Sequence, residues 1–307
     1  MTEMRISVLD TSPIVAGSSA RQALHNTVDL AVLADELGYH RYWVPEHHSM
    51  RGVASSAPAV LAGRLADATT RIRVGAGGVL LPNHAPLVVA EQFGTLAALH
   101  CGRIDLGIGR ALGGPPQVAA ALRRTDTGFP EQISELIGYF EATDEQQVSA
   151  VPALGNPVQF WLLGSSANSA RLAATLGLPY AFARHLNPAG AVEATSAYRE
   201  ACPEPELIVS VSAIVADTDE RAEWLAGPTR LKVRSRKRGE RIPLPSPADV
   251  DPAELTDPLP GLVVGSPDTV REQLQAIADE TGADELMITT PVYDHADRRR
   301  SYELLKP

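Results

Sequence analysis

The sequence predicts an α/β fold, a closed (β/α)8 TIM barrel with an insertion after the seventh strand. Two observations lead to this prediction. Short apolar segments alternate with helical patterns along the chain, and three helical segments end in a glycine that an apolar segment soon follows, at Gly38, Gly177 and Gly282. Glycine adopts the left-handed position after a helix easily, and strict alternation is typical of a parallel sheet. Eight strands imply closure, and a doubly wound open sheet is the alternative.

Each element has its own signal in the sequence. Strands are expected near 5–9, 41–45, 72–80, 104–108, 159–163, 180–184, 207–215 and 285–290. Helices are expected near 20–37, 56–68, 86–99, 130–141, 166–176, 188–200, 218–226, 267–280 and 295–305. Ser19 opens a capping box, and Ser266 precedes a proline at the first helical position. We expect one domain over residues 1–307.

Composition and charge limit the kind of protein. A chain of 307 residues, 44% hydrophobic, can bury a large core, which excludes a disordered chain or a coiled coil. The net charge of −10 opposes binding to nucleic acid or anionic lipid. No segment has the roughly 18 uninterrupted apolar residues of a membrane span. Cys101 and Cys202 form no C-x-x-C pair, so we expect a reduced, cytoplasmic protein with a small-molecule partner.

Residues 227–262 interrupt the alternation. They contain many prolines and a basic cluster, and they are expected to be too irregular for one helix. The cluster consists of Arg230, Lys232, Arg234, Arg236, Lys237, Arg238 and Arg241. An insertion after the seventh strand lies at the catalytic mouth of a barrel, so it is either a lid or a disordered loop. A nucleic-acid patch is disfavoured by the acidic remainder of the chain.

Catalytic groups of such barrels lie where strands end at their carboxyl side. The second strand ends in Val44-Pro45-Glu46-His47-His48. Side chains alternate along a strand, so His47 and His48 should point apart and should not share a metal ion, and no H-x-H or H-E-x-x-H spacing occurs. We therefore predict no metal, an inward His47 that acts as a general acid, base or hydrogen-bond donor, and a structural His48.

The third strand contains an unusual glycine-rich run, Gly75-Ala76-Gly77-Gly78. Glycine weakens strand pairing, so such a run marks a bulge or the close approach of another molecule. A flat ring lying against this strand would make use of the missing side chains. Both interpretations stay open at this point.

Two neighbouring strand ends could bind a phosphate. Arg110 follows the fourth strand, and Gly164, Ser165 and Ser166 open a helix after the fifth, where free N–H groups and the helix dipole favour an anion. The segment from Gly107 has the wrong glycine spacing for a dinucleotide-binding fingerprint. The alternatives are a surface salt bridge for Arg110 and an ordinary helix cap for the serines.

Together these motifs resemble the bacterial luciferase-like flavin monooxygenase superfamily, in particular its short branch with tailoring enzymes of bacterial secondary metabolism. The resemblance covers residues 6–305 and is strongest at 43–48, 74–82, 102–110 and 265–270. It implies a flavin ring against the third strand, with a cis peptide at the pair Gly77 and Gly78. It assigns His47 to the active site, and it assigns Arg110 with the Gly164 to Ser166 turn to the phosphate. Gly109 replaces the reactive cysteine of the luciferases, so light emission is not implied.

The activity that the resemblance implies is an FMNH2-dependent monooxygenase. Reduced FMN from a separate flavin reductase would react with O2 to give a flavin 4a-hydroperoxide, which inserts one oxygen atom into a small organic substrate, as in a tailoring step of antibiotic or polyketide biosynthesis. The family also implies a homodimer through the small-residue helices near 56–68 and 86–99. A deazaflavin-dependent hydride-transfer enzyme and a non-catalytic flavin-binding protein are the alternatives.

Overall fold

The computed structural model describes residues 4–125, 128–141, 147–240, 242–251 and 258–306. Its strands are β1 (Arg5–Leu9), β2 (Arg41–Val44), β3 (Arg73–Leu80), β4 (Ile104–Gly109), β5 (Gln159–Gly164), β6 (Tyr180–Phe182), β7 (Leu207–Val215), β8 (Leu262–Gly265) and β9 (Glu285–Thr289). Strands β1 to β7 and β9 form a parallel ring, because β6 pairs with β7, β7 with β9, and β9 with β1. The barrel prediction is confirmed, and the open-sheet alternative is wrong.

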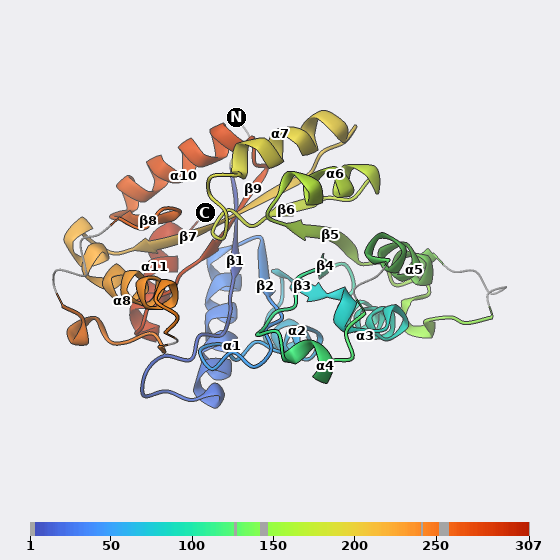
Figure 1. Ribbon diagram of the computed structural model, residues 1–307, viewed down its shortest axis with the longest axis horizontal. Coiled ribbons are helices and arrows are strands. Elements are labelled where there is room, and N and C mark those ends of the chain that lie inside the picture. Colours follow the sequence, from blue (N-terminus) through green and yellow to red (C-terminus); the bar gives the residue numbers. More distant parts are fainter. Residues whose placement is uncertain (1–3, 126–127, 142–146, 241, 252–257, 307) are drawn as a thin grey trace.

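Helices lie around the ring of strands (Figure 1). They are α1 (Ala20–Leu37), α2 (Pro58–Ala68), α3 (Pro86–Leu99), α4 (Val118–Ala121), α5 (Phe129–Glu141), α6 (Ala167–Thr175), α7 (Ala191–Ala201), α8 (Asp219–Lys237), α10 (Pro267–Thr281) and α11 (His295–Leu305). Gly38 and Gly282 end α1 and α10 with φ of 87° and 65°, as the glycine signals predict. Short 3-10 turns at Leu81–Asn83, Val151–Ala153 and Pro247–Asp249 complete the elements.

The prediction for residues 227–262 is wrong in its first third. Helix α8 continues through Pro228 to Lys237 and includes most of the basic cluster, while Arg241 lies outside the described residues. Proline removes one helical hydrogen bond, but other contacts hold this turn: Thr229 donates to the carbonyl of Pro291, and Arg230 forms an ion pair at 2.5 Å with Glu223 of the same helix. Local patterning cannot reveal such contacts.

An unpredicted strand, β8, begins where this region ends. Strand β8 pairs with the last four residues of β7, which extend beyond the point where β6 pairs. Earlier in the insertion, Leu244 is buried and its carbonyl accepts a hydrogen bond from Ala16 N at 2.9 Å. Part of the insertion therefore packs on the loop after β1. Whether the segment closes over the mouth stays a prediction.

The inside of the barrel is filled by side chains from several strands. Leu9, Trp43, Trp161, Ala181, Ile208 and Met287 form this inner cluster. Trp43 and Trp161 meet edge to face, with ring centroids 5.7 Å apart. A larger apolar layer lies between the strands and the helices. The interior is therefore a packed core, which leaves only the ends of the barrel for chemistry.

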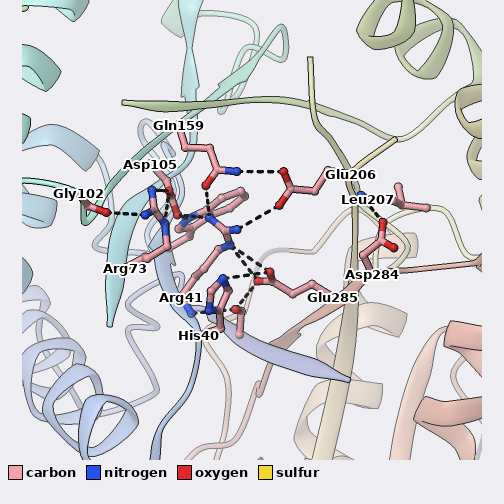
Figure 2. Close-up of polar contacts among 12 residues, drawn as sticks. His40, Arg41, Arg73, Gly102, Asp105, Gln159, Glu206, Leu207, Asp284 and Glu285 are labelled. Atoms are coloured by element: carbon pink, nitrogen blue, oxygen red, sulfur yellow. Dashed lines mark hydrogen bonds and ion pairs between the residues drawn. The ribbon is translucent and has the colours of Figure 1, made fainter. Parts of the chain in front are cut away.

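A buried charge network closes the amino-terminal end of the barrel (Figure 2). Arg41, the first residue of β2, pairs with Asp105 at 2.9 Å and with Glu285 at 3.1 Å. Arg73, the first residue of β3, pairs with Asp105 at 2.5 Å. Because each buried charge has an opposite partner, the network is a structural closure, and the carboxyl ends of the strands remain as the place for a site.

Candidate active site at the carboxyl ends of the strands

His47 lies in the loop that leaves the carboxyl end of β2, two residues after Pro45. It alternates with Trp43 and Pro45, and Trp43 packs inside the barrel. Its Nδ1 is buried without a hydrogen-bond partner among the described residues. Burial lowers the pKa of His47, and the neighbouring His48 lowers it further, with Glu46 acting in the opposite direction. The structure thus presents a neutral imidazole at the mouth.

Glu46 organises the loop that carries His47. Its buried carboxylate accepts four hydrogen bonds, from His48 Nε2 at 2.7 Å, His84 Nε2 at 2.9 Å, Asn83 Nδ2 at 3.0 Å and Leu80 N at 3.0 Å. Burial raises the pKa of the Glu46 carboxyl, but the bonds from His84, Asn83 and His48 outweigh that effect and hold the pKa below its ordinary value of 4.5. The sequence analysis gave Glu46 no role.

The network of Glu46 explains the two histidines beside it. His48 and Glu46 lie on the same side of the chain, and His47 lies on the other, as the alternation predicts. His48 binds the Glu46 carboxylate from the same loop, whereas His84 binds it from the turn after β3 and so connects that turn to the loop after β2. Asn83 extends this connection, because its Oδ1 accepts from Arg124 Nη1 at 3.0 Å.

The glycine run on β3 contains a bulge and one open position. The register shifts between Ala76 and Val79, and the Gly77–Gly78 peptide is cis. A side chain at Gly75 would meet the backbone of Asp105, and one at Gly78 would lie 2.6 Å from the carbonyl oxygen of Gly107. Close packing against β4 therefore explains these two glycines.

Gly77 differs from its neighbours on β3. It is the one residue of Val74–Leu80 that is not buried, and a Cβ there would come within 3.0 Å of Leu9 and 3.1 Å of Trp43 on the inner side. Leu9 and Trp43 fill the space where that side chain would lie, so the exposed part of Gly77 is its backbone, against which a flat group could lie. Gly75, Ala76 and Gly78 are buried and shape this position from within the sheet.

Arg110 and the turn after β5 lie on neighbouring strands. Ile108 pairs with Leu162, so the register places Arg110 level with Gly164. Arg110 is exposed, and its guanidinium has no partner among the described residues, which argues against the salt-bridge alternative. Ser166 caps α6 and accepts from Ser169 N at 3.4 Å, while Ser165 O accepts from Asn187 Nδ2 at 2.9 Å.

The anion-binding character of this turn comes from the helix start. Ser166 leaves the first N–H groups of α6 directed at the mouth, where the helix dipole favours a negative charge. A free guanidinium one strand away adds a fixed positive charge. The cap alternative for Ser166 is thus correct, and it is compatible with an anion at the same helix end.

His185, after β6, is a mouth residue that the sequence analysis missed. Its Nδ1 lies 2.6 Å from Ser210 Oγ on β7, and burial lowers its pKa to about 4, with the charge of His47 adding to the effect. Its position is itself a sequence signal, because His185 directly follows the predicted strand 180–184 just as His47 follows the predicted strand 41–45.

Within the described ranges, no group of three or more His, Cys, Asp or Glu side chains is arranged to hold a metal ion. The residues present suit a flat, anionic cofactor better. An accessible glycine backbone, a neutral histidine and a cation beside a helix start could bind a ring and a phosphate at once. In the described part of the chain, no helix is long and apolar enough to cross a membrane.

These features define a (β/α)8 barrel with a cofactor-type site at its mouth, and comparison with known proteins identifies the family. The family model for luciferase-like monooxygenase matches residues 4–285. A luciferase-like monooxygenase of Escherichia coli (strain K12) is 45% identical, over 99% of this chain and 97% of the relative. An N-acetyl-S-alkylcysteine monooxygenase of Bacillus subtilis is 34% identical, over 98% and 97%. The chain belongs to the luciferase-like monooxygenase family and is an enzyme of that family.

Solved structures agree with this assignment. The crystal structure of apo-MsnO8 is 40% identical, with a TM-score of 0.94, and the match covers 99% of this chain and 98% of that one. The oxygenating constituent of 3,6-diketocamphane monooxygenase from Pseudomonas putida, in complex with FMN, has a TM-score of 0.74 at 24% identity, covering 99% and 96%. The second likeness shows the shared fold.

Proposed function

We propose that the protein is a monooxygenase that uses reduced FMN and O2 to insert one oxygen atom into a small organic substrate. The observation that carries the proposal is the row of features on four consecutive strands. His47 follows β2, the open backbone of Gly77 lies on β3, Arg110 follows β4 and the Ser165–Ser166 turn follows β5. A ring on Gly77 with its phosphate toward Arg110 would place the reacting edge of a flavin near His47. An FMN complex of a protein with the same fold supports the choice of cofactor.

The residues have separable roles in this proposal. When bound, reduced FMN supplies two electrons, so that one atom of O2 enters the substrate and the other leaves as water. Gly77 admits the ring, and Arg110 with the first N–H groups of α6 holds the phosphate. His47 donates a hydrogen bond from Nε2 to an oxygen at the mouth. This assignment follows because its buried Nδ1 has no partner and is better left as a lone pair than as an orphaned N–H.

We extend the proposal to partners and setting. In this proposal a separate flavin reductase would supply reduced FMN by diffusion. Helices α2 and α3 expose Val60, Val88 and Leu99, which supports a homodimer through these helices. Cys101 and Cys202 are both free, which supports a cytoplasmic location. The small-molecule substrate would be an intermediate of antibiotic or polyketide assembly.

The test is an anaerobic titration with reduced FMN, with reduced deazaflavin in parallel, followed by stopped-flow mixing with oxygenated buffer. We expect FMN to bind and then to show an absorbance transient distinct from both reduced and oxidised FMN. Binding of deazaflavin alone, without an oxygen-dependent transient, would indicate hydride transfer instead. FMN binding that leaves the reaction with oxygen unchanged would indicate a non-catalytic flavin-binding protein.

A variant tests the role of His47 in the same assay. His47→Ala should bind reduced FMN with unchanged affinity but shorten the lifetime of the transient, because the hydrogen-bond donor at the mouth is lost. His25→Ala, at an exposed position on α1, is the matched control. If His47→Ala leaves the transient and the turnover as in the control, His47 does not have this role.

A further inference from the structure

His185 has its position fixed by strand β7. Its backbone N donates to Ser210 O at 3.1 Å, and its Nδ1 lies 2.6 Å from Ser210 Oγ. Ser210 alternates with Ile208, whose side chain belongs to the inner cluster, so Ser210 faces the inside of the barrel. The ring of His185 therefore lies over the inner side of the mouth rather than between the barrel and its helices.

The hydroxyl of Ser210 decides which nitrogen of His185 carries the proton. Ser210 Oγ has one hydrogen, and it donates that hydrogen to the carbonyl of Phe182 at 3.2 Å. It can then only accept from His185, so Nδ1 carries the N–H. In a neutral ring the other nitrogen, Nε2, is left with a lone pair. The charge state is consistent with this assignment, since burial and His47 lower the pKa of His185 to about 4.

The lone pair on Nε2 is left without a partner in the described part of the chain, at a position that is not fully enclosed. Nε2 has no hydrogen-bond partner among the described residues, and it is not among their enclosed polar atoms, whereas Nδ1 of His47 is. His47 presents an N–H from its own Nε2, for the reason given above. The mouth thus offers one donor, on His47, and one acceptor, on His185.

We propose that His185 is a substrate-recognising residue, whose Nε2 accepts a hydrogen bond from an O–H or N–H group of the organic substrate, and that Ser210 is the positioning residue that fixes its tautomer. The inference rests on the proposed function in one respect, because it takes the bound molecule to be the substrate that is oxygenated. His185 would favour substrates that carry a hydrogen-bond donor next to the position that is oxidised.

The tautomer is tested without cofactor. In protein labelled with 15N-histidine, two-bond 15N–1H correlation spectra distinguish the Nδ1–H form from the Nε2–H form. The His185 signals are assigned by their absence in His185→Gln. We expect the Nδ1–H form at pH 7, and a shift toward the Nε2–H form in Ser210→Ala. An Nε2–H form or a charged ring in the unchanged protein overturns the proposal.

Recognition is tested with phenol and anisole, a pair that differs by the O–H donor. Binding is followed by calorimetry on the FMN-loaded protein and by the Nε2 shift of His185. Phenol should bind about tenfold more tightly than anisole, the size expected for one net hydrogen bond, and His185→Phe should remove the preference. Equal affinities, or no binding of phenol, overturn the proposal. A failed oxygen reaction with an intact phenol preference would reject the proposed function alone.

Discussion

Replacing Glu46 by glutamine gives the sharpest test of how the site is held. Each carboxylate oxygen accepts two bonds: Oε1 from His48 and Asn83, and Oε2 from Leu80 N and His84. In Glu46→Gln one oxygen becomes an NH2 group, so the two donors that face it lose their acceptor in either orientation, and one of the two is always a histidine. That histidine can change tautomer and accept a hydrogen bond from the new NH2 group. The N–H of Leu80 cannot become an acceptor, and Asn83 can accept only if it gives up its hydrogen bond from Arg124.

The expected magnitude follows from this count. The bond that is lost outright is worth roughly 1.5–3 kcal/mol, the three that remain weaken because their partner is no longer charged, and the uncharged glutamine avoids part of the carboxylate's desolvation cost. We expect Glu46→Gln to lower the free energy of unfolding by about 2–4 kcal/mol at pH 7. Urea unfolding followed by tryptophan fluorescence measures it, provided that the m-value is unchanged. Glu272→Gln, an exposed position on α10, is the matched control.

The pH dependence of the free energy of unfolding tests the same contacts of Glu46. The folded pKa of Glu46 lies below its ordinary 4.5, so the ionised group stabilises the folded protein above that pH, and the stabilisation is lost as the pH falls through the folded value. The difference between the original protein and Glu46→Gln should therefore narrow below pH 4.5. If the free energies of unfolding of the two proteins differ by less than about 0.5 kcal/mol at pH 7, as expected for a neutral surface substitution, the reasoning is refuted.

Three further predictions concern the cofactor and the surface. Arg110→Ala should weaken FMN binding about tenfold or more and leave riboflavin unaffected, because only FMN carries the phosphate; equal losses in a fluorescence titration would remove that assignment. Gly78→Ala should destabilise the barrel by about 1–3 kcal/mol in urea, since its Cβ would lie 2.6 Å from Gly107 O, and an unchanged midpoint would contradict the packing argument. Val60→Asp combined with Leu99→Asp should convert a dimer to a monomer in sedimentation, and an unchanged mass would show that these helices do not associate.

The strands and helices were predictable because their signals are local. Apolar runs, capping serines and glycines after helices gave nearly all element positions, and Gly38 and Gly282 adopt the left-handed conformation that the pattern requires. Pro228 was misleading, because propensity disfavours proline within a helix, while the contact of Thr229 with Pro291 comes from a distant part of the chain. Strand β8 was missed because it forms by pairing with the part of β7 that extends beyond β6.

By itself the sequence determined the alternation that makes a barrel, and it determined that His47, Arg110 and Ser166 follow strand ends, since strand ends can be read from a local pattern. Only the tertiary structure decided which of these groups have partners. Whether a carboxylate such as Glu46 binds donors from two segments, or a hydroxyl such as Ser210 fixes a histidine 25 residues away, depends on strand register and closure. Those are set by packing across the whole barrel, because hydrogen bonds form between groups that are close in space whatever their separation along the chain.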